Sequence, residues 1–273
     1  PDTVWTLAEG APPPAAGAPA DATLPATPGA LGGDPLAGAE VVATLTPDSP
    51  VVLTWDNGAG LRFTRRISVD DAFLFTIEER VENAGATPAT LAPYGFIARD
   101  GREESPANFI LHEGVVRMSD GKLQEIAYAD LADLDPAEDG SRQEAIEVAQ
   151  DGWVGFTDKY WMTTLIPEPG TPFRSVARFI PQGEVLQTLA RKAPETVAPG
   201  AALETRSMVF AGAKEWGTIR AYEAAGIDRF LDSIDWGWFW FLTKPMFWLL
   251  HHLNRLIGNM GWAIIGLTLV IKA

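Results

Sequence analysis

The stretch Val51-Val-Leu-Thr-Trp-Asp-Asn-Gly58 begins with five residues that favour a β-strand and ends in a turn sequence. Asp56, Asn57 and Gly58 accept the backbone angles of a tight turn between antiparallel strands. Beyond this turn, Phe63, Ile67 and Val69 fall on the opposite side of the chain from their polar neighbours, as in a strand with one buried face. The stretch therefore predicts a β-hairpin.

The same pattern continues to about residue 212. Phe73, Phe75, Ile77 and Val81 alternate with polar residues, and residues 83–85 (Asn-Ala-Gly) supply a turn. Further strands are expected at Tyr94–Arg99, Val115–Met118, Trp153–Thr157, Trp161–Ile166, Ser175–Ile180, Val185–Arg191 and Leu203–Phe210. Short strands at regular spacing with Gly and Pro turns predict a mainly β fold, a large β-sandwich. The acidic segment 130–142 is expected to be an exposed loop with a short helical turn.

The N-terminal part has a different composition. Ala, Pro and Gly fill 22 of the 29 positions from 11 to 39, which predicts a loop or linker because such a segment buries too little apolar surface to fold. The first residues read as if cut from a longer chain. We expect residues 1–39 to be linker and residues 40–226 to be the sandwich domain.

Helical spacing returns after the sandwich. Residues 214–225 place Trp216, Ile219 and Tyr222 on one face, which predicts a short helix packed on the sandwich. Phe230, Leu231 and Ile234 are expected to anchor the chain that follows. We assign residues 227–260 to this connector and an amphipathic helix.

The amphipathic helix is predicted for residues 237–257. One face carries leucines and a methionine at steps of three and four, and another carries Lys244, His251 and Arg255 with Trp248 among them. Pro245 lies near its start, and Gly258-Asn259 is a stop signal. The apolar positions are Leu242, Met246, Leu249, Leu253 and Leu256.

Six of the ten tryptophans lie at or after residue 216. Tryptophan favours the boundary between membrane and water, and a basic face beside an apolar aromatic face is typical of a helix lying in a bilayer surface. The alternative is a core helix of a soluble domain. The residues assigned to the membrane-surface helix are Trp238, Trp240, Phe241, Lys244, Pro245, Trp248 and Arg255.

The last segment, 261–273, is apolar up to Lys272. Ten helical residues cover about 15 Å, whereas the hydrocarbon core of a bilayer is about 30 Å thick, so the run is too short to span it. We expect the first half of a transmembrane helix. Lys272 then either faces a hydrophilic cavity within the membrane or extends to the lipid headgroups, and the residues alone leave both open.

These C-terminal motifs resemble the bacterial YidC membrane protein insertases. The similarity is specific in Trp238–Leu250, Ile257–Ile265 and Leu267–Lys272, and looser upstream. The looser segments are Asp48–Trp55, Phe63-Thr64, Val81–Gly85, Asn108–His112, Gly152–Phe156 and Tyr160-Trp161.

The resemblance implies a twisted periplasmic sandwich similar to sugar-binding sandwiches, then a surface helix and the second transmembrane helix. It places Lys272 in a hydrophilic groove where the family usually has arginine, so the charge is retained but the bidentate geometry is lost. The implied protein is a multi-pass bacterial inner-membrane insertase and chaperone, not an enzyme, with residues 1–235 in the periplasm. The implied partners are nascent inner-membrane proteins, the Sec translocon, the lipid bilayer and, through cytoplasmic parts outside this sequence, the ribosome. No cofactor is implied.

Charge and residue chemistry exclude several functions. The net charge of −15 argues against binding of nucleic acid. The absence of cysteine excludes disulfides and thiolate metal sites. Because they are adjacent on a helix, His251 and His252 diverge by about 100° and form a poor chelating pair, so no metal site is expected.

Acidic neighbours on a strand point to opposite faces, which argues against a glycosidase at Asp70-Asp71, Glu78-Glu79 or Glu103-Glu104. No catalytic residue is predicted. The alternative function is an anchored carbohydrate-binding or carbohydrate-modifying sandwich that uses Trp153, Tyr160 and Trp161.

Overall fold

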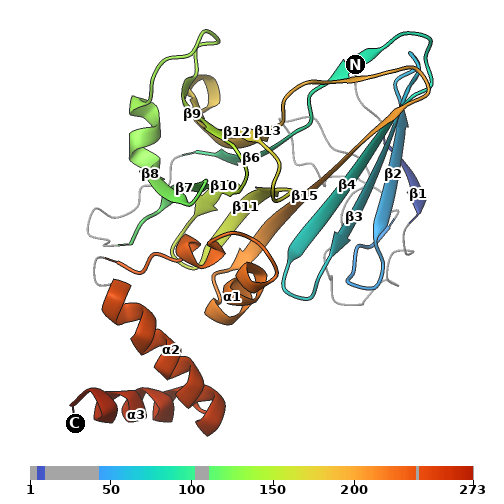
Figure 1. The fold of residues 1–273 in the computed structure, drawn as a ribbon. Coiled ribbons are helices and arrows are strands. Elements are labelled where there is room, and N and C mark those ends of the chain that lie inside the picture. The colour runs from blue at the N-terminus through green and yellow to red at the C-terminus, as the bar shows by residue number, and fades with distance from the viewer. Residues whose placement is uncertain (1–4, 10–42, 102–110, 238–239, 273) are drawn as a thin grey trace.

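The computed structural model describes residues 5–9, 43–101, 111–237 and 240–272. Two antiparallel β-sheets pack face to face and form the body, and the α-helices gather at one end of it (Figure 1). The fold class predicted from sequence, a mainly β sandwich followed by helices, is confirmed. The α-helices within these residues are α1 (Trp216–Ala224), α2 (Trp240–Ile257) and α3 (Met260–Lys272).

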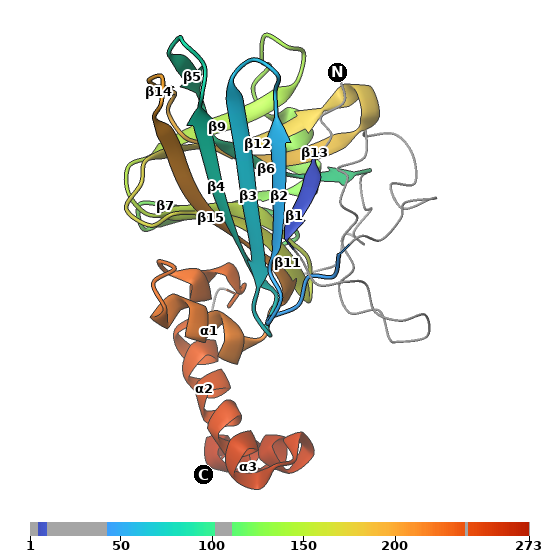
Figure 2. The same cartoon turned by 90° about the vertical axis from the view of Figure 1, so that its right-hand side faces the viewer.

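The larger sheet has nine strands in the order β1-β2-β3-β4-β15-β11-β10-β7-β8. Strands β1 to β4 run side by side along one half of it (Figure 2). The bounds are β1 Thr6–Glu9, β2 Val51–Asp56, β3 Leu61–Val69, β4 Leu74–Asn83, β15 Ala202–Ala213, β11 Trp161–Pro167, β10 Gly152–Thr157, β7 Gly114–Ser119 and β8 Lys122–Ala127.

The smaller sheet has four strands in the order β6-β13-β12-β9, and a further pair joins β14 to β5. The bounds are β6 Tyr94–Asp100, β13 Val185–Arg191, β12 Phe173–Ile180, β9 Arg142–Val148, β14 Glu195–Val197 and β5 Ala89–Leu91. The short 3-10 helices are η1 Tyr128–Asp133, η2 Pro181–Gly183 and η3 Phe230–Ser233.

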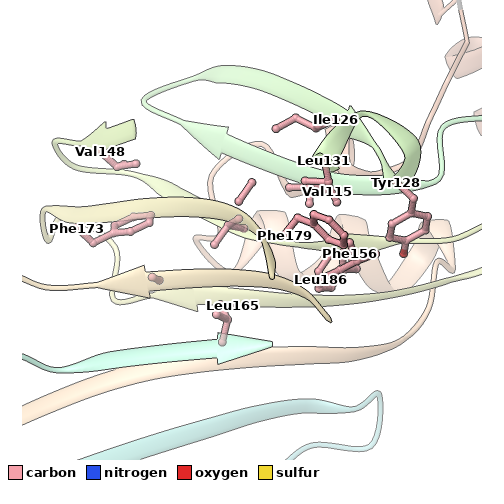
Figure 3. Close-up of a cluster of buried hydrophobic side chains, with 13 residues drawn as sticks. Val115, Ile126, Tyr128, Leu131, Val148, Phe156, Leu165, Phe173, Phe179 and Leu186 are labelled. Carbon is pink, nitrogen blue, oxygen red and sulfur yellow. The ribbon is translucent and has the colours of Figure 1, made fainter. Parts of the chain in front are cut away.

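The first core lies between the two sheets. Phe156 and Leu165 of the large sheet belong to the same buried cluster as Phe179 and Leu186 of the small sheet (Figure 3). Leu131 of η1 is fully buried in this cluster. The segment 130–142, expected to be an exposed loop, thus contains the predicted helical turn but also contributes to the core.

A second core lies on the opposite face of the large sheet. Trp153 and Phe210 of that sheet pack with Ile219 of α1 and with Phe230 of η3. The ring of Phe230 meets those of Trp153 and Phe210 edge to face, at centroid distances of 5.6 and 5.8 Å. The helix predicted for residues 214–225 and its burial against the sandwich are therefore confirmed.

Every strand expected from alternation is present, with ends that differ by at most three residues. Five further strands were not predicted, namely β1, β5, β8, β9 and β14. Some of these strands are short. Others, such as β9 (Arg-Gln-Glu-Ala-Ile-Glu-Val), carry polar residues at half-buried positions, so the alternation of polar and apolar residues is weak. Strand β1 lies inside the expected linker 1–39, whereas residues 10–42 lie outside the described residues.

Among the described residues, no helix combines the length and apolarity that crossing a membrane requires. The assignment of residues 261–273 to the start of a transmembrane helix stays a prediction.

We expect Phe230→Ala to lower the free energy of unfolding by about 3–5 kcal/mol, because it removes a fully buried ring from the second core. Urea denaturation followed by circular dichroism measures this change. Tyr94→Ala is the control, because 62% of Tyr94 is exposed and its removal should change stability by about 0.5 kcal/mol or less. Equal losses in the two variants would show that η3 does not seal this core.

Candidate functional site

Helix α2 has two contrasting faces, as its sequence predicts. Lys244, Phe247 and His251 lie about one turn apart and contact the sandwich end of the molecule. The predicted apolar face lies roughly opposite and includes Leu256, of which 84% is exposed. The apolar surface of α2 therefore points away from the sandwich.

Aromatic side chains hold α2 against α1. The Trp216 ring lies 4.7 Å from the His251 ring and 6.3 Å from the Phe247 ring. Phe247 also meets Trp236 edge to face at 5.8 Å. Only 8% of Trp216 is exposed in this arrangement, so α2 covers this side chain of α1.

Polar contacts fix the same junction. The Lys244 ammonium donates to Asp232 Oδ1 at 2.9 Å and lies 5.5 Å from the centre of the Trp236 ring. The second oxygen of Asp232 accepts from Arg229 Nε at 2.9 Å. Thr243 Oγ1 donates to the carbonyl oxygen of Trp236 at 2.9 Å. Asp232 thus connects η3 to the first turns of α2.

The segment that leads into α2 is tied to the start of β7. Asp235 Oδ2 accepts a hydrogen bond from the backbone N–H of His112 at 2.9 Å. Its other oxygen accepts from the N–H of Gly237 at 2.7 Å, where the backbone has φ 65°, an angle that favours glycine. This turn sends the chain away from the sandwich.

Helices α2 and α3 are joined by a tight turn. Gly258 has φ 71°, which confirms the predicted stop. Asn259 Oδ1 then accepts from the N–H of Trp262 at 3.2 Å and caps α3. Ala263 is buried, and Gly266 faces the Leu253 side chain, so α3 packs on α2.

The structure places most of the sequence-predicted site residues in or next to these helices. Phe241, Pro245, Trp248 and Arg255 are exposed on α2, and Lys244 is half-buried at the junction. Trp240 is the first residue of α2, and Trp238 lies outside the described residues. Lys272 is the exposed last residue of α3. Whether these residues act at a membrane stays a prediction.

Sequence reasoning missed the partners that hold α2 in place. Trp216 was expected to pack on the sandwich, but its contact with α2 was not foreseen. The ion pair between Lys244 and Asp232 was not predicted either. An acid twelve residues before Lys244 carries no periodicity, so no local signal marks this ion pair.

No group of three potential ligands in the described residues can hold a metal ion. His112 Nε2 lies 3.0 Å from the carbonyl oxygen of Val115. Glu79 pairs with Arg65 and Glu78 with Arg66, whereas Glu103 and Glu104 lie outside the described residues. Asp70 accepts from the Tyr222 hydroxyl at 2.7 and 2.9 Å. These groups have structural partners.

The aromatic trio proposed for carbohydrate does not form one face. Trp153 is fully buried and donates from Nε1 to the carbonyl oxygen of Asp228 at 3.0 Å. Tyr160 and Trp161 are exposed at the turn between β10 and β11. Trp153 is therefore a core residue, and only Tyr160 and Trp161 reach the surface.

A groove of about 560 Å³ lies elsewhere, between β3, β4 and β15 of the large sheet and edge strand β6. Trp55 and Phe63 stack in its wall at 4.7 Å, and Tyr94 and Phe96 line the opposite side. Its Arg65 and Glu79 side chains pair with each other. The groove is therefore built from other elements than the contact of α2 with α1 and η3.

The comparisons with known proteins agree on one family. Residues 35–249 match the family described as the YidC periplasmic domain. A protein of Paracoccus denitrificans (strain Pd 1222) with the name membrane protein insertase YidC is 54% identical over 231 residues, which cover 84% of this chain and 36% of that protein. A protein of the same name from Ruegeria sp. (strain TM1040) is 53% identical over 236 residues, 86% of this chain and 39% of that protein.

The chain spans about two fifths of the length of the curated relatives it matches. A third relative shows the same proportion. This membrane protein insertase YidC of Cereibacter sphaeroides (strain ATCC 17029 / ATH 2.4.9) is 52% identical over 263 residues, 90% of this chain and 42% of that protein.

Solved structures with a similar arrangement are more distant. A galactose mutarotase related enzyme from Lactobacillus acidophilus aligns over 60% of this chain and 67% of its own, with 10% identity and a TM-score of 0.40. A putative aldose 1-epimerase from Klebsiella pneumoniae aligns over 69% of this chain and 56% of its own, with 10% identity and a TM-score of 0.42.

We expect Trp216→Ala to release α2 from the sandwich, because it removes the ring that contacts both Phe247 and His251. The chain contains no cysteine, so spin labels can be attached at Glu184→Cys on the sandwich and Arg255→Cys on α2. The distribution of distances between the labels should broaden. Trp248→Ala is the matched control, because Trp248 is exposed and its ring contacts only His252 of α2 itself among the ring contacts described. Broadening in both variants, or in neither, would contradict this description of the junction.

We also expect the junction to weaken in acid. Burial lowers the pKa of His251 below its ordinary value, and the positive charges of His252, Arg255 and Arg220 lower it further. The docked state therefore favours neutral His251, so the contribution of this residue is complete above about pH 6.5 and is lost as the pH falls through the depressed pKa. With the α2 label moved to the exposed position Leu256→Cys, which keeps the charge of Arg255, the distance distribution should broaden from about pH 8 to about pH 5. His251→Gln should abolish this dependence and the exposed His252→Gln should retain it, whereas the reverse pattern would contradict the assignment.

Proposed function

The chain belongs to the YidC family, and from this membership we propose that it is part of a membrane protein insertase and chaperone of the bacterial inner membrane. The parent protein would assist insertion and folding of inner-membrane proteins, alone or with the Sec translocon. The single observation that carries the proposal is the identity of 52–54% to proteins named membrane protein insertase YidC over 84–90% of this chain. Residues 1–235 would lie in the periplasm.

Helix α2 would lie on the periplasmic surface of the membrane. Its docked face carries Lys244 and His251, and its opposite face exposes leucines. A helix in a bilayer surface needs this division, with the apolar face in the acyl region and the charged face toward water. The exposed aromatic residues Phe241 and Trp248 would lie at the level of the headgroups.

Helix α3 would be the start of a transmembrane helix, with Lys272 in a hydrophilic groove. A charge in the hydrocarbon region is costly unless it lies in a hydrated cavity or has a partner. Such a groove would lower the cost of moving a polar segment of the substrate partway into the bilayer. The apolar segment of the substrate would then partition into lipid, and this partitioning would drive insertion.

The expected partners follow from this mechanism. They are nascent inner-membrane proteins, components of the Sec translocon and the lipid bilayer, with the ribosome bound through parts of the protein outside this chain. The proposed mechanism uses no enzymatic step and no cofactor, because partitioning into lipid supplies the free energy.

The test is an insertion assay in cells depleted of the full-length protein. A single-span substrate is followed by protease accessibility from the periplasmic side, and variants of the full-length protein are supplied back. We expect wild type and Lys272→Arg to restore insertion and Lys272→Ala to lose most of it, because only the first two place a cation in the groove. Lys122→Ala, at an exposed lysine of β8, is the control and should restore insertion fully.

The outcomes separate two parts of the proposal. Equal rescue by wild type and Lys272→Ala would remove the groove role of Lys272 and leave the insertase function in place. Normal insertion in depleted cells would contradict the insertase function itself.

A further inference from the structure

We propose that the turn between β10 and β11 is a second contact of this protein with the lipid surface, in which Tyr160 and Trp161 enter the headgroup region beside α2. The inference rests on the proposed function, which places α2 at the membrane surface. The turn comprises Asp158, Lys159 and Tyr160 and is followed by the first residue of β11, Trp161.

The two aromatic side chains of this turn are exposed, although the surrounding strands are buried. Tyr160 is 65% and Trp161 63% exposed, whereas β10 is buried along nearly its whole length. Tyr and Trp carry an apolar ring with one polar group, the combination that is enriched where a membrane meets water. Lys159 adds an ammonium group 5.1 Å from the centre of the Tyr160 ring. A cation above an interfacial ring is well suited to lipid phosphates.

The turn lies next to the segment from which α2 emerges. Lys159 donates its backbone N–H to Glu113 Oε1 at 3.2 Å, and the neighbouring His112 is bonded to Asp235 just before α2. On its other side, the carbonyl oxygen of Tyr160 accepts from the N–H of Lys214 at 2.8 Å, two residues before Trp216. Two residues extend at most about 7 Å, so the turn is close to the side chain on which α2 packs.

The turn is held in one conformation. The N–H of Asp158 donates to the carbonyl oxygen of Trp161 at 2.8 Å, and Trp161 pairs with Ala213 of β15. Lys214 Nζ donates to Thr157 Oγ1 at 2.9 Å. A fixed presentation lowers the entropy lost when the two rings are ordered at a surface.

The acid of the turn does not oppose contact with lipid phosphates. Both oxygens of Asp158 accept from Arg99 Nη1, at 2.9 and 2.8 Å, and Oδ1 also accepts from the Tyr128 hydroxyl at 3.0 Å. The negative charge is therefore compensated inside the sandwich. The exposed rings of Tyr160 and Trp161 lie on the surface of the turn.

Lipid is favoured over a soluble ligand or a protein because of position. Tyr94 and Phe96 are also exposed aromatic residues, but they line the groove at β6. The turn around Tyr160 is bonded to Lys214 just before α1 and to Glu113, whose neighbour His112 is bonded to Asp235 just before α2. The turn lies near the start of α2, and in this proposal the membrane that receives the apolar face of α2 also reaches the turn, so that the two lipid contacts are continuous.

The experiment uses the full-length protein with 5-fluorotryptophan in nanodiscs of phosphatidylcholine and phosphatidylglycerol. Spin-labelled headgroups broaden the fluorine signals of tryptophans close to the lipid surface. Trp161 is assigned by the signal lost in Trp161→Phe, and Trp248 and Trp153 are assigned in the same way. We expect broadening for Trp161 and for Trp248 of α2, and none for Trp153, which is fully buried in the sandwich.

The outcomes separate this inference from the proposed function. A sharp Trp161 signal beside a broadened Trp248 signal would overturn the second contact while leaving α2 at the surface. A sharp Trp248 signal would contradict the surface position of α2, on which the second contact also depends. A Trp161 signal that shifts without broadening when Sec components are added would assign the turn to a protein partner and overturn the inference.

Discussion

The arrangement of the molecule depends on the burial of the large sheet on both faces around β7, β10 and β11. Five of the six residues of β7 are buried, and the same is true of β10. A sheet of this kind needs a cover on each side. The small sheet covers one face, and α1 with η3 covers the other. Because the second cover comes from the chain that follows β15, the polypeptide has to leave the sandwich at this end, and α2 begins there (Figure 1).

The same cover determines how α2 is oriented. Trp216 of α1 contacts Phe247 and His251 of α2, and Asp232 of η3 holds Lys244. An ion pair this close to solvent contributes about 1 kcal/mol or less, whereas a large buried ring contributes about 1.5–3 kcal/mol. The aromatic contacts therefore supply most of the stability of the junction, and the ion pair selects which face of α2 is docked. Lys244 and His251 turn inward as a result, and Leu242 and Leu256 are exposed on the opposite face.

Much of the fold could be predicted because alternation is strong where one face is wet. Val51–Asp56, Leu61–Val69 and Leu74–Asn83 show this clearly, and the helix α1 follows from the spacing of Trp216, Ile219 and Tyr222. Strands such as β9 were missed, because their identity comes from pairing with β12 and not from their own composition. The site was predicted in part. The periodicity of the sequence reveals the two faces of α2, but it does not reveal which residues each face contacts. Asp232 and Trp216 become visible only once the chain has folded back on the large sheet.

The position of the exposed aromatic turn follows from the same topology. Strand β11 pairs with β15, so the turn that precedes β11 lies beside the end of β15, where the chain enters α1. A sandwich attached to a surface through α2 alone could rotate about that junction, because the contacts at Trp216 and Asp232 are confined to one short region. A second contact at Tyr160 and Trp161 would act at high effective concentration once α2 is bound. Even a weak interaction there would restrict the rotation of the sandwich about α2. The translational and rotational entropy of binding to the membrane has already been lost when α2 binds.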